Sequence, residues 1–374
     1  MALKTVHLTP LSNNHNHHHH HLNHHSNNVP HPTFNNCHHL DDNDHKGDPD
    51  NNKFMVIGHR GTGMNLLQSS DSRMKSIKEN SILAFNSAGE FDIDFIEFDV
   101  QVTKDDCPII FHDNFIFTKE KGEIVEKRVT DMTLDEFLSY GPQRDPNKVG
   151  KPLFRKTKDG RIFEWKVEKD DHFCTLEEVF QKVNHSKGFN IEFKFDDNII
   201  YTEEELVHAI QVVLRVVFKY ANDRPIFFSS FQPDATLLVR KLQSTHLVFF
   251  LTNGGMETYT DERRNSLEEA MKLCLEGGLN GIVAEVRSIL RNPGIVKRIK
   301  DAKLSIISYG QLNNMREVIN AQILMGVDGA IVDLVKEIIA AVAEVKNENE
   351  VGKGEEDDIK YSNLMKLIPG LVQP

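Results

Sequence analysis

Short apolar segments of strand length recur eight times between residues 53 and 345, and helix-like segments separate most of them. Where strands and helices alternate, the helices act as crossovers that bring the chain back to a parallel sheet. Eight such units close into a (β/α)8 barrel of the TIM type, which is the α/β fold we expect. The predicted strands cover residues 54–58, 95–100, 190–195, 226–231, 247–252, 281–286, 304–309 and 329–333.

Several helix starts are marked by a Ser or Thr followed three positions later by a Glu. The two side chains of such a pair bond each other's free backbone amides. Asn80 is expected to cap a further helix over 81–91, and Gly277-Gly278 is expected to end the helix that begins at Ser266. The four capping pairs are Thr133/Glu136, Thr175/Glu178, Thr202/Glu205 and Ser266/Glu269.

A ninth apolar run, at 108–112, follows the second predicted strand too closely for a crossover helix. We expect a hairpin there, because a short turn can join only antiparallel strands. The hairpin folds His112 back toward Glu97 and Asp99. Either His112 caps the hairpin through the neighbouring Asp113, or Asp113 orients the imidazole ring.

Residues 114–174 interrupt the alternation with clusters of Lys, Asp, Gly and Pro, including a polar hairpin around 158–160. We expect an insertion after the second strand that lies over the mouth of the barrel. The barrel domain is predicted to span 53–345, and a charged C-terminal tail is predicted over 346–374.

Residues 1–52 differ in composition, because 13 of the 19 histidines lie there among Asn and Ser. Such a segment buries too little apolar surface to fold, so we expect a disordered leader; the alternative is adventitious metal chelation by the histidine run. The first acidic residue is Asp41, a trait of transit peptides, but no Arg precedes Arg60. The expected location is intracellular, in the plastid (chloroplast) or the cytosol.

The overall composition argues against several classes of partner. A net charge of −12 disfavours binding to nucleic acid, whose phosphates require a cationic surface. The chain has no uninterrupted apolar run of about 18 residues, so no transmembrane segment is predicted. The four cysteines form no C-x-x-C pair and are expected to be reduced thiols. The expected partner is a small molecule, and the oligomeric state stays open.

Two of the predicted strands carry ionisable side chains where hydrocarbon would be expected. Successive side chains of a strand face opposite sides, so Glu97 and Asp99 share one face, and Glu192 and Lys194 share another. Three carboxylates and one lysine on inward faces are costly unless a cation compensates them. Because the ligands are carboxylates without thiolates, we expect a hard cation, Mg²⁺ or alternatively Ca²⁺.

Catalytic groups of such barrels lie at the carboxyl ends of the strands, and His59 and Arg60 directly follow the first strand. Three carboxylates and a divalent ion leave one negative charge, which Arg60 and Lys194 reverse to about +1. A singly charged phosphodiester suits that pocket, and Arg60 can grip its oxygens with a bidentate fork. His59 and His112 titrate near neutrality and are the expected acid–base pair.

At these residues the chain resembles the plant-type members of the glycerophosphodiester phosphodiesterase family, within the PLC-like phosphodiesterase superfamily. The resemblance covers roughly residues 53–345, and its segments follow one another in the family's order. The matching segments are Gly58-His59-Arg60-Gly61, Glu79-Asn80-Ser81, Ile96-Glu97-Phe98-Asp99-Val100, Phe111-His112-Asp113, Ile191-Glu192-Phe193-Lys194 and Phe228-Ser229-Ser230-Phe231.

The resemblance implies metal-dependent hydrolysis of glycerophosphodiesters, such as glycerophosphocholine and glycerophosphoethanolamine, to glycerol 3-phosphate and an alcohol. It also implies a TIM-type barrel with an insertion after the second strand. The attacking group is either water or the substrate's own glycerol hydroxyl, which would give a cyclic phosphate first. The implied roles are metal ligation by Glu97, Asp99 and Glu192, acid–base catalysis by His59 and His112, and phosphate contact by Arg60 and Lys194.

The chain departs from the family pattern at three places. Ser81 stands where Thr is common, the last strand ends Val332-Asp333 instead of Thr-Asp, and Ser308-Tyr309 stand where a Trp is common. Tyr309 is therefore the expected substrate contact on that strand. The alternatives to this function are a lysophospholipase D-like phosphodiesterase that acts on acylated substrates and a catalytically inactive scaffold.

Overall fold

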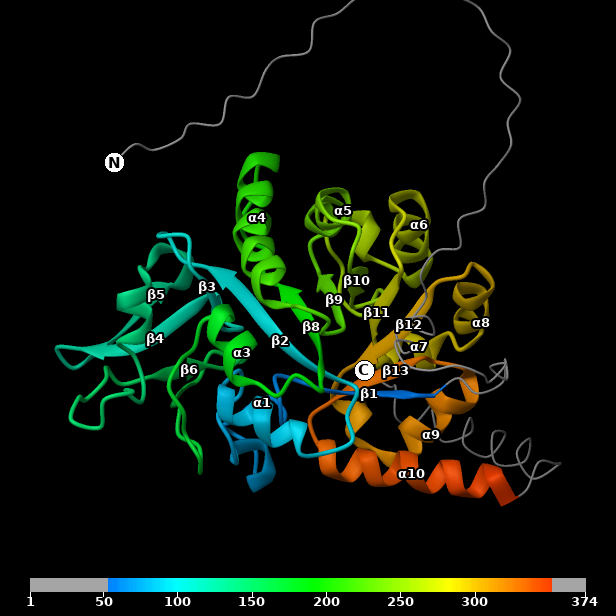
Figure 1. The fold of residues 1–374 in the computed structure, drawn as a ribbon, viewed down its shortest axis with the longest axis horizontal. Helices are drawn as coiled ribbons and strands as arrows, with labels where there is room; N and C mark the ends of the chain where they lie inside the picture. Colours follow the sequence, from blue (N-terminus) through cyan, green and yellow to red (C-terminus); the bar gives the residue numbers. More distant parts are fainter. Residues whose placement is uncertain (1–52, 352–374) are drawn as a thin grey trace, which may run out of the picture. The chain divides into compact units, whose positions relative to one another are not determined.

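The computed structural model describes residues 53–351, and side chains as far as residue 345. Eight parallel strands form a closed barrel, because β1 pairs with β2 on one side and with β13 on the other. All eight predicted strands are present, so the predicted TIM-type barrel is confirmed (Figure 1). In barrel order the strands are β1 (Met55–Gly58), β2 (Phe95–Val102), β8 (Gly188–Phe193), β9 (Ile226–Ser230), β10 (Leu247–Thr252), β11 (Gly281–Glu285), β12 (Ser305–Tyr309) and β13 (Gly329–Val332).

Helices cover the outside of the barrel and fill most of the intervals between its strands. Among the described residues, no helix combines the length and the apolar character that crossing a membrane requires. The helices are α1 (Ile82–Gly89), α3 (Leu176–Lys182), α4 (Glu203–Tyr220), α5 (Pro233–Leu242), α6 (Leu267–Gly277), α7 (Val286–Arg291), α8 (Gly294–Asp301), α9 (Arg316–Met325) and α10 (Val335–Val351), with short 3-10 turns η2 (Ser72–Lys75), η4 (Glu262–Arg264) and η5 (Gln311–Asn314).

The four predicted Ser and Thr caps are present, but only two of the four predicted pairs are reciprocal. Thr175 and Thr202 form reciprocal capping boxes, whereas the side chains of Thr133 and Ser266 cap by accepting the backbone N–H three residues on. Gly278 ends α6 in the left-handed conformation, with φ 63°. The prediction that Asn80 caps α1 is wrong.

The hydroxyl of Ser81, one residue further on, caps α1 by accepting the N–H of Ala84. Asn80 adopts a positive φ of 54°, and its side-chain amide donates to Asp99 Oδ2 at 2.8 Å. A left-handed turn before the helix therefore sends this amide toward β2 and leaves the capping position to serine.

Two hydrophobic cores follow from the two-residue period of the strands. One core lies between the barrel and its helices, and the other fills the barrel itself. Because alternate side chains point inward, the inward positions beyond this second core come to lie at the carboxyl ends of the strands. The buried members of the inner core are Met55, Ile57, Phe95, Phe227, Leu247, Phe249, Leu251, Val283, Ile307 and Ile331.

The predicted hairpin after β2 is also present, with β3 (Pro108–Ile110) antiparallel to β2. The insertion that follows holds a separate four-stranded sheet with a core of its own, beside the end of β2 in Figure 1. Arg128 and Lys158 contact loops that follow β8 and β10, so the insertion borders the barrel's carboxyl face. Its elements are β4 (Phe115–Glu120), β5 (Glu123–Arg128), η3 (Val129–Asp131), α2 (Leu134–Leu138), β6 (Phe154–Lys156) and β7 (Ile162–Glu164).

Both predicted terminal segments fall at or beyond the edge of this description. The predicted leader at 1–52 lies outside the described residues, as does the tail from 352 onward. The backbone of α10 continues to Val351, so the first six residues of the predicted tail are helical.

The opposite, amino-terminal face of the barrel depends on a buried arginine, which supplies a test of stability. Arg224, two residues before β9, donates to the carbonyl oxygens of Val183, Asn184 and Lys187 at 2.8–2.9 Å. Its guanidinium carbon lies 4.0 Å from the centre of the Phe189 ring. The side chain thus satisfies the carbonyls that end α3 and lead into β8.

Arg224→Met keeps the apolar stem but leaves three carbonyl oxygens without this donor. We expect the free energy of unfolding, measured with urea, to fall by roughly 2–4 kcal/mol. Arg215→Met, on the exposed side of α4, is the matched control and should change stability by less than about 0.5 kcal/mol. Equal stability of the two variants would contradict this role of Arg224.

Candidate active site

Polar side chains replace hydrocarbon at the carboxyl ends of the barrel strands, on the inward-facing positions. Asp99 of β2 lies opposite Glu192 of β8 in the strand register. On the far side of the barrel, Tyr309 of β12 lies opposite Glu285 of β11. The two-residue alternation therefore delivers predicted site residues from separate strands to one end of the barrel.

The three carboxylates predicted as metal ligands form one buried cluster. Glu97, Asp99 and Glu192 each present an oxygen, and these oxygens lie within 4.8 Å of one another. Lys194 donates to Glu192 Oε1 at 2.7 Å and lies 3.7 Å from Asp99 Oδ1. Oε1 of Glu97 is buried and has no hydrogen-bond partner. An unpartnered anionic oxygen beside two further carboxylates fits a hard divalent cation.

Crowding of the carboxylates also changes their affinity for protons. Burial and the neighbouring Asp99 carboxylate raise the pKa of Glu97 to about 8. Burial also raises the pKa of Glu192 despite the attraction of Lys194. For Asp99, burial acts in the same direction, but Arg60, His112 and Lys194 outweigh it and hold the pKa below its usual range. Without a metal ion the cluster therefore retains a proton near neutrality.

Arg60 ties two of these carboxylates to the turn after β1. Its backbone N–H donates to Glu97 Oε2 at 2.8 Å, and its Nε lies 3.2 Å from Asp99 Oδ2. Nη1 donates to Glu79 Oε1 at 2.7 Å, and the residue is only 5% exposed. The contacts of this guanidinium are therefore with carboxylates, while its predicted grip on a phosphate stays a prediction.

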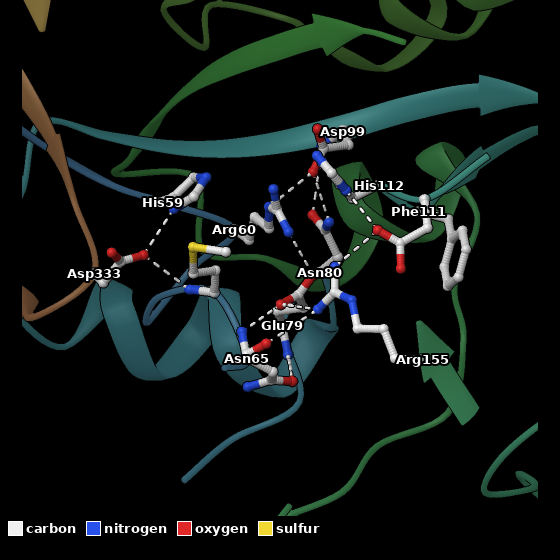
Figure 2. A network of polar contacts seen from close by, with 12 residues as sticks. His59, Arg60, Asn65, Glu79, Asn80, Asp99, Phe111, His112, Arg155 and Asp333 are labelled. Carbon is white, nitrogen blue, oxygen red and sulfur yellow. Dashed lines mark hydrogen bonds and ion pairs between the residues drawn. The ribbon is translucent and has the colours of Figure 1, made fainter. Parts of the chain in front are cut away.

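Each of the two predicted histidines has a carboxylate at Nδ1. His59 pairs with Asp333 and His112 pairs with Asp113, both at 2.7 Å (Figure 2 shows the first pair at the end of β13). A carboxylate at Nδ1 favours the tautomer that carries a proton there and leaves Nε2 to exchange protons. Nε2 of His59 lies 4.0 Å from Glu97 Oε2, so this edge faces the acidic cluster.

The surroundings move the two imidazoles in opposite directions. Burial lowers the pKa of His59, but the Asp333 carboxylate more than compensates and the net shift is upward. Burial, helped by the charges of Arg60 and Lys194, lowers the pKa of His112 to about 4. A pair of groups whose pKa values are pushed apart can hold one proton and accept another, which acid–base catalysis requires.

Tyr309 lies on the side of the mouth formed by β9 to β12. Its hydroxyl bonds Oδ1 of Asn253, and its ring packs edge-on against Phe231 at 5.8 Å between centres. Phe231 in turn lies 5.7 Å below the ammonium of Lys194. Tyr309 therefore connects to the acidic cluster through an aromatic ring, and its predicted contact with substrate stays a prediction.

Sequence reasoning gave four residues that hold the site together no part in the site itself. Asp333 directly follows β13, so the strand-end rule that singled out the other groups applies to it as well. Glu79 and Asn80 stood in one of the matching family segments, and Asn80 was otherwise expected only to cap α1. Arg155 had no signal in the sequence. Asp113 contacts Nδ1 of His112, and its role in orienting the ring stays a prediction.

The chain is similar to known proteins of one family. The profile of the Glycerophosphoryl diester phosphodiesterase family matches residues 59–337. Glycerophosphodiester phosphodiesterase GDPD3 of Arabidopsis thaliana is 62% identical and covers 82% of this chain and 83% of its own. Glycerophosphodiester phosphodiesterase GDPD1, chloroplastic, from the same plant is 58% identical over 86% of this chain and 91% of its own. The glycerophosphocholine phosphodiesterase gde1 of Schizosaccharomyces pombe is 31% identical over 78% of this chain but 28% of its own.

Solved structures share the fold at low sequence identity. A glycerophosphodiester phosphodiesterase of Parabacteroides distasonis superposes with a TM-score of 0.55 at 20% identity, over 79% of this chain and 99% of its own. A phosphodiesterase of Oleispira antarctica, solved with its product sn-glycerol-3-phosphate, gives a TM-score of 0.54 at 19% identity, over 77% of this chain and 96% of its own. At these identities the similarity concerns the barrel fold.

The raised pKa of Glu97 predicts how the stability of the metal-free protein depends on pH. The folded chain keeps this proton up to about pH 8, whereas the unfolded chain releases it near the ordinary value of 4.5. The folded state thus binds more protons, and its stability falls as pH rises. His59 acts in the same direction above pH 6.5, whereas His112, whose pKa is lowered in the folded state, opposes the decline weakly until the unfolded imidazole has lost its proton. With chelator present, the free energy of unfolding should fall by up to about 2 kcal/mol between pH 6.5 and 8.

Glu97→Gln removes the titrating carboxyl and should flatten most of this decline, as urea titrations at several pH values would show. Glu276→Gln, on the exposed side of α6, is the matched control and should keep the wild-type slope. A decline in the Glu97 variant as steep as in the wild type would mean that another group causes it.

Proposed function

Because this chain belongs to the glycerophosphoryl diester phosphodiesterase family, plant type, we propose that it hydrolyses compounds such as glycerophosphocholine and glycerophosphoethanolamine to glycerol 3-phosphate and an alcohol. The chain is a glycerophosphodiester phosphodiesterase, and the choice of headgroup, the metal and the residue roles form the proposal. One observation carries it: a buried cluster of three carboxylates, beside His59 and His112, with a carboxylate at Nδ1 of each imidazole.

Glu97, Asp99 and Glu192 are the residues that would hold Mg²⁺ or, alternatively, Ca²⁺. Their oxygens are close enough to serve one ion, and the unpartnered Oε1 of Glu97 supplies a ligand that nothing else uses. A bound divalent ion would neutralise charge on the phosphoryl oxygens during cleavage. Lys194 and Arg60 lie on the rim of the same cluster and add positive charge for a phosphodiester.

The two imidazoles divide the proton transfers between them. One Nε2 takes the proton of the attacking hydroxyl, from water or from the substrate's glycerol, and the other gives a proton to the oxygen of the departing alcohol. The protons balance, because the base gains what the acid loses and solvent resets both. The support is that each Nδ1 is already bound by a carboxylate, which holds the ring orientation and stabilises the protonated form.

Activity and metal dependence are tested together with the full-length protein. We expect glycerol 3-phosphate release from glycerophosphocholine with Mg²⁺ or Ca²⁺, and its loss after chelation or in the double variant Glu97→Ala, Asp99→Ala. Release that persists after chelation would contradict the metal mechanism. Turnover of lysophosphatidylcholine alone would favour a lysophospholipase D-like enzyme, and no turnover of any diester would favour a scaffold.

The roles of the histidines are tested by His59→Ala and His112→Ala. Each should lower kcat by about 10²–10⁴-fold, because each removes one proton transfer. His208→Ala, on the exposed side of α4, is the matched control and should retain wild-type kcat. If either site variant keeps its full kcat while the protein remains folded, that imidazole has no part in the reaction.

A further inference from the structure

An arginine of the insertion reaches into the carboxyl end of the barrel. Arg155 of β6 is 9% exposed, and its Nη2 donates to Asp113 Oδ1 at 2.9 Å. Its Nη1 donates to Glu79 Oε2 at 2.9 Å and to the carbonyl oxygen of Asn65 at 3.3 Å. Figure 2 shows this guanidinium close to Glu79 and to the carboxylate beside His112.

Arg155 contacts the same oxygen of Asp113 that accepts the hydrogen bond from the imidazole of His112. Asp113 Oδ1 lies 2.7 Å from Nδ1 of His112 and 2.9 Å from Nη2 of Arg155. An aspartate that shares one oxygen between two partners has a fixed rotamer, because a turn about its side-chain bonds would break both contacts. The guanidinium also supplies the positive charge that keeps this carboxyl ionised, so that it accepts the N–H of the ring.

The second carboxylate that Arg155 contacts links this arginine to the metal-ligand side of the site. Glu79 is 3% exposed and receives Arg155 on Oε2 and Arg60 on Oε1. Burial would raise the pKa of Glu79, but the two arginines bring it down to about 2. Arg60 then contacts Asp99. Only a planar fork with two separate donor nitrogens can serve both carboxylates in this way.

The folding of the insertion sets the place of Arg155. Its guanidinium carbon lies 4.3 Å from the ring centre of Trp165, and the indole N–H donates to Asn65 Oδ1 at 3.0 Å. Arg155 pairs with Phe163 across the β6–β7 hairpin, and Trp165 follows directly after β7. The hairpin therefore presents the guanidinium in one orientation.

We propose that Arg155 is a positioning residue for catalysis: through Asp113 it fixes the imidazole of His112, so that this ring is in place only when the insertion is folded against the barrel. The inference rests on the proposed phosphodiesterase function. It assigns the insertion a part in the reaction itself, and Arg155 need not touch the substrate.

The competing explanation is that Arg155 only anchors the insertion. The two explanations differ in what a substitution changes. Loss of an anchor lowers stability, or disturbs substrate binding and turnover together. Loss of ring positioning lowers kcat while KM and the fold are retained, because the imidazole acts in the proton transfer.

The test uses the full chain and glycerophosphocholine. Arg155→Met should lower kcat about 10–100-fold with KM changed less than about threefold. Arg155→Lys keeps the charge but serves only one carboxylate, so its kcat should lie between those of the wild type and of Arg155→Met. It also provides the test if the methionine variant does not fold. Arg161→Met removes an exposed arginine of the same hairpin, which pairs with Asp159, and should behave as the wild type.

Two further measurements separate positioning from anchoring. If Arg155 acts through Asp113, the double variant Arg155→Met, Asp113→Asn should be hardly less active than the less active of its two single variants. The downfield proton resonance of the His112 Nδ1–H, assigned by its loss in His112→Ala, should shift or broaden in Arg155→Met and stay unchanged in Arg161→Met.

Multiplicative losses in the double variant, an unchanged resonance, or wild-type kcat in a folded Arg155→Met would overturn the inference. These outcomes differ from failure of the proposed function. In that case the wild type itself would release no glycerol 3-phosphate, or His112→Ala would retain full activity.

Discussion

The structure depends on how it compensates three carboxylates buried at one end of a hydrocarbon-filled barrel. Their oxygens lie within 4.8 Å of one another, directly above an inner core of aliphatic and aromatic side chains. Such a cluster cannot stay fully ionised without positive charge nearby. Lys194 and Arg60 supply part of that charge, and the proton held by Glu97 supplies another part. Because this positive charge only partly compensates the three carboxylates, the cluster can still bind a divalent cation.

From this cluster, negatively and positively charged side chains alternate in a connected series that leads to the insertion. Asp99, Arg60, Glu79, Arg155 and Asp113 follow one another in contact, from the second barrel strand to the insertion. Each carboxylate lies beside a guanidinium, so the burial cost of each ion is met by its neighbour. The arrangement explains why an insertion that has its own sheet and core is nonetheless joined to the site. Its arginine completes the series that otherwise would end at Glu79.

Residues that stabilise the barrel and residues of the candidate site lie at opposite ends of it. At the amino-terminal face, Arg224 serves only backbone carbonyls, and its position is set by the ends of α3 and β8. At the carboxyl-terminal face, the arginines serve carboxylates and leave one carboxylate oxygen unpartnered. Three bonds to backbone carbonyls suit a structural residue, whereas an unsatisfied buried carboxylate oxygen is a cost that a ligand can relieve.

The sequence by itself determined the barrel and the groups at the ends of its strands, because both follow from local periods. Alternation of strands and helices gave eight units, and the two-residue period placed Glu97, Asp99 and Glu192 on inward faces. Only the tertiary structure decided which side chains contact and orient the reactive residues. His59 meets Asp333 only when the last strand closes against the first, 274 positions away. Arg155 reaches Asp113 only when the insertion folds back, and Asn80 turns to Asp99 instead of capping its helix. These contacts depend on closure of the chain in space, which no local pattern of residues records.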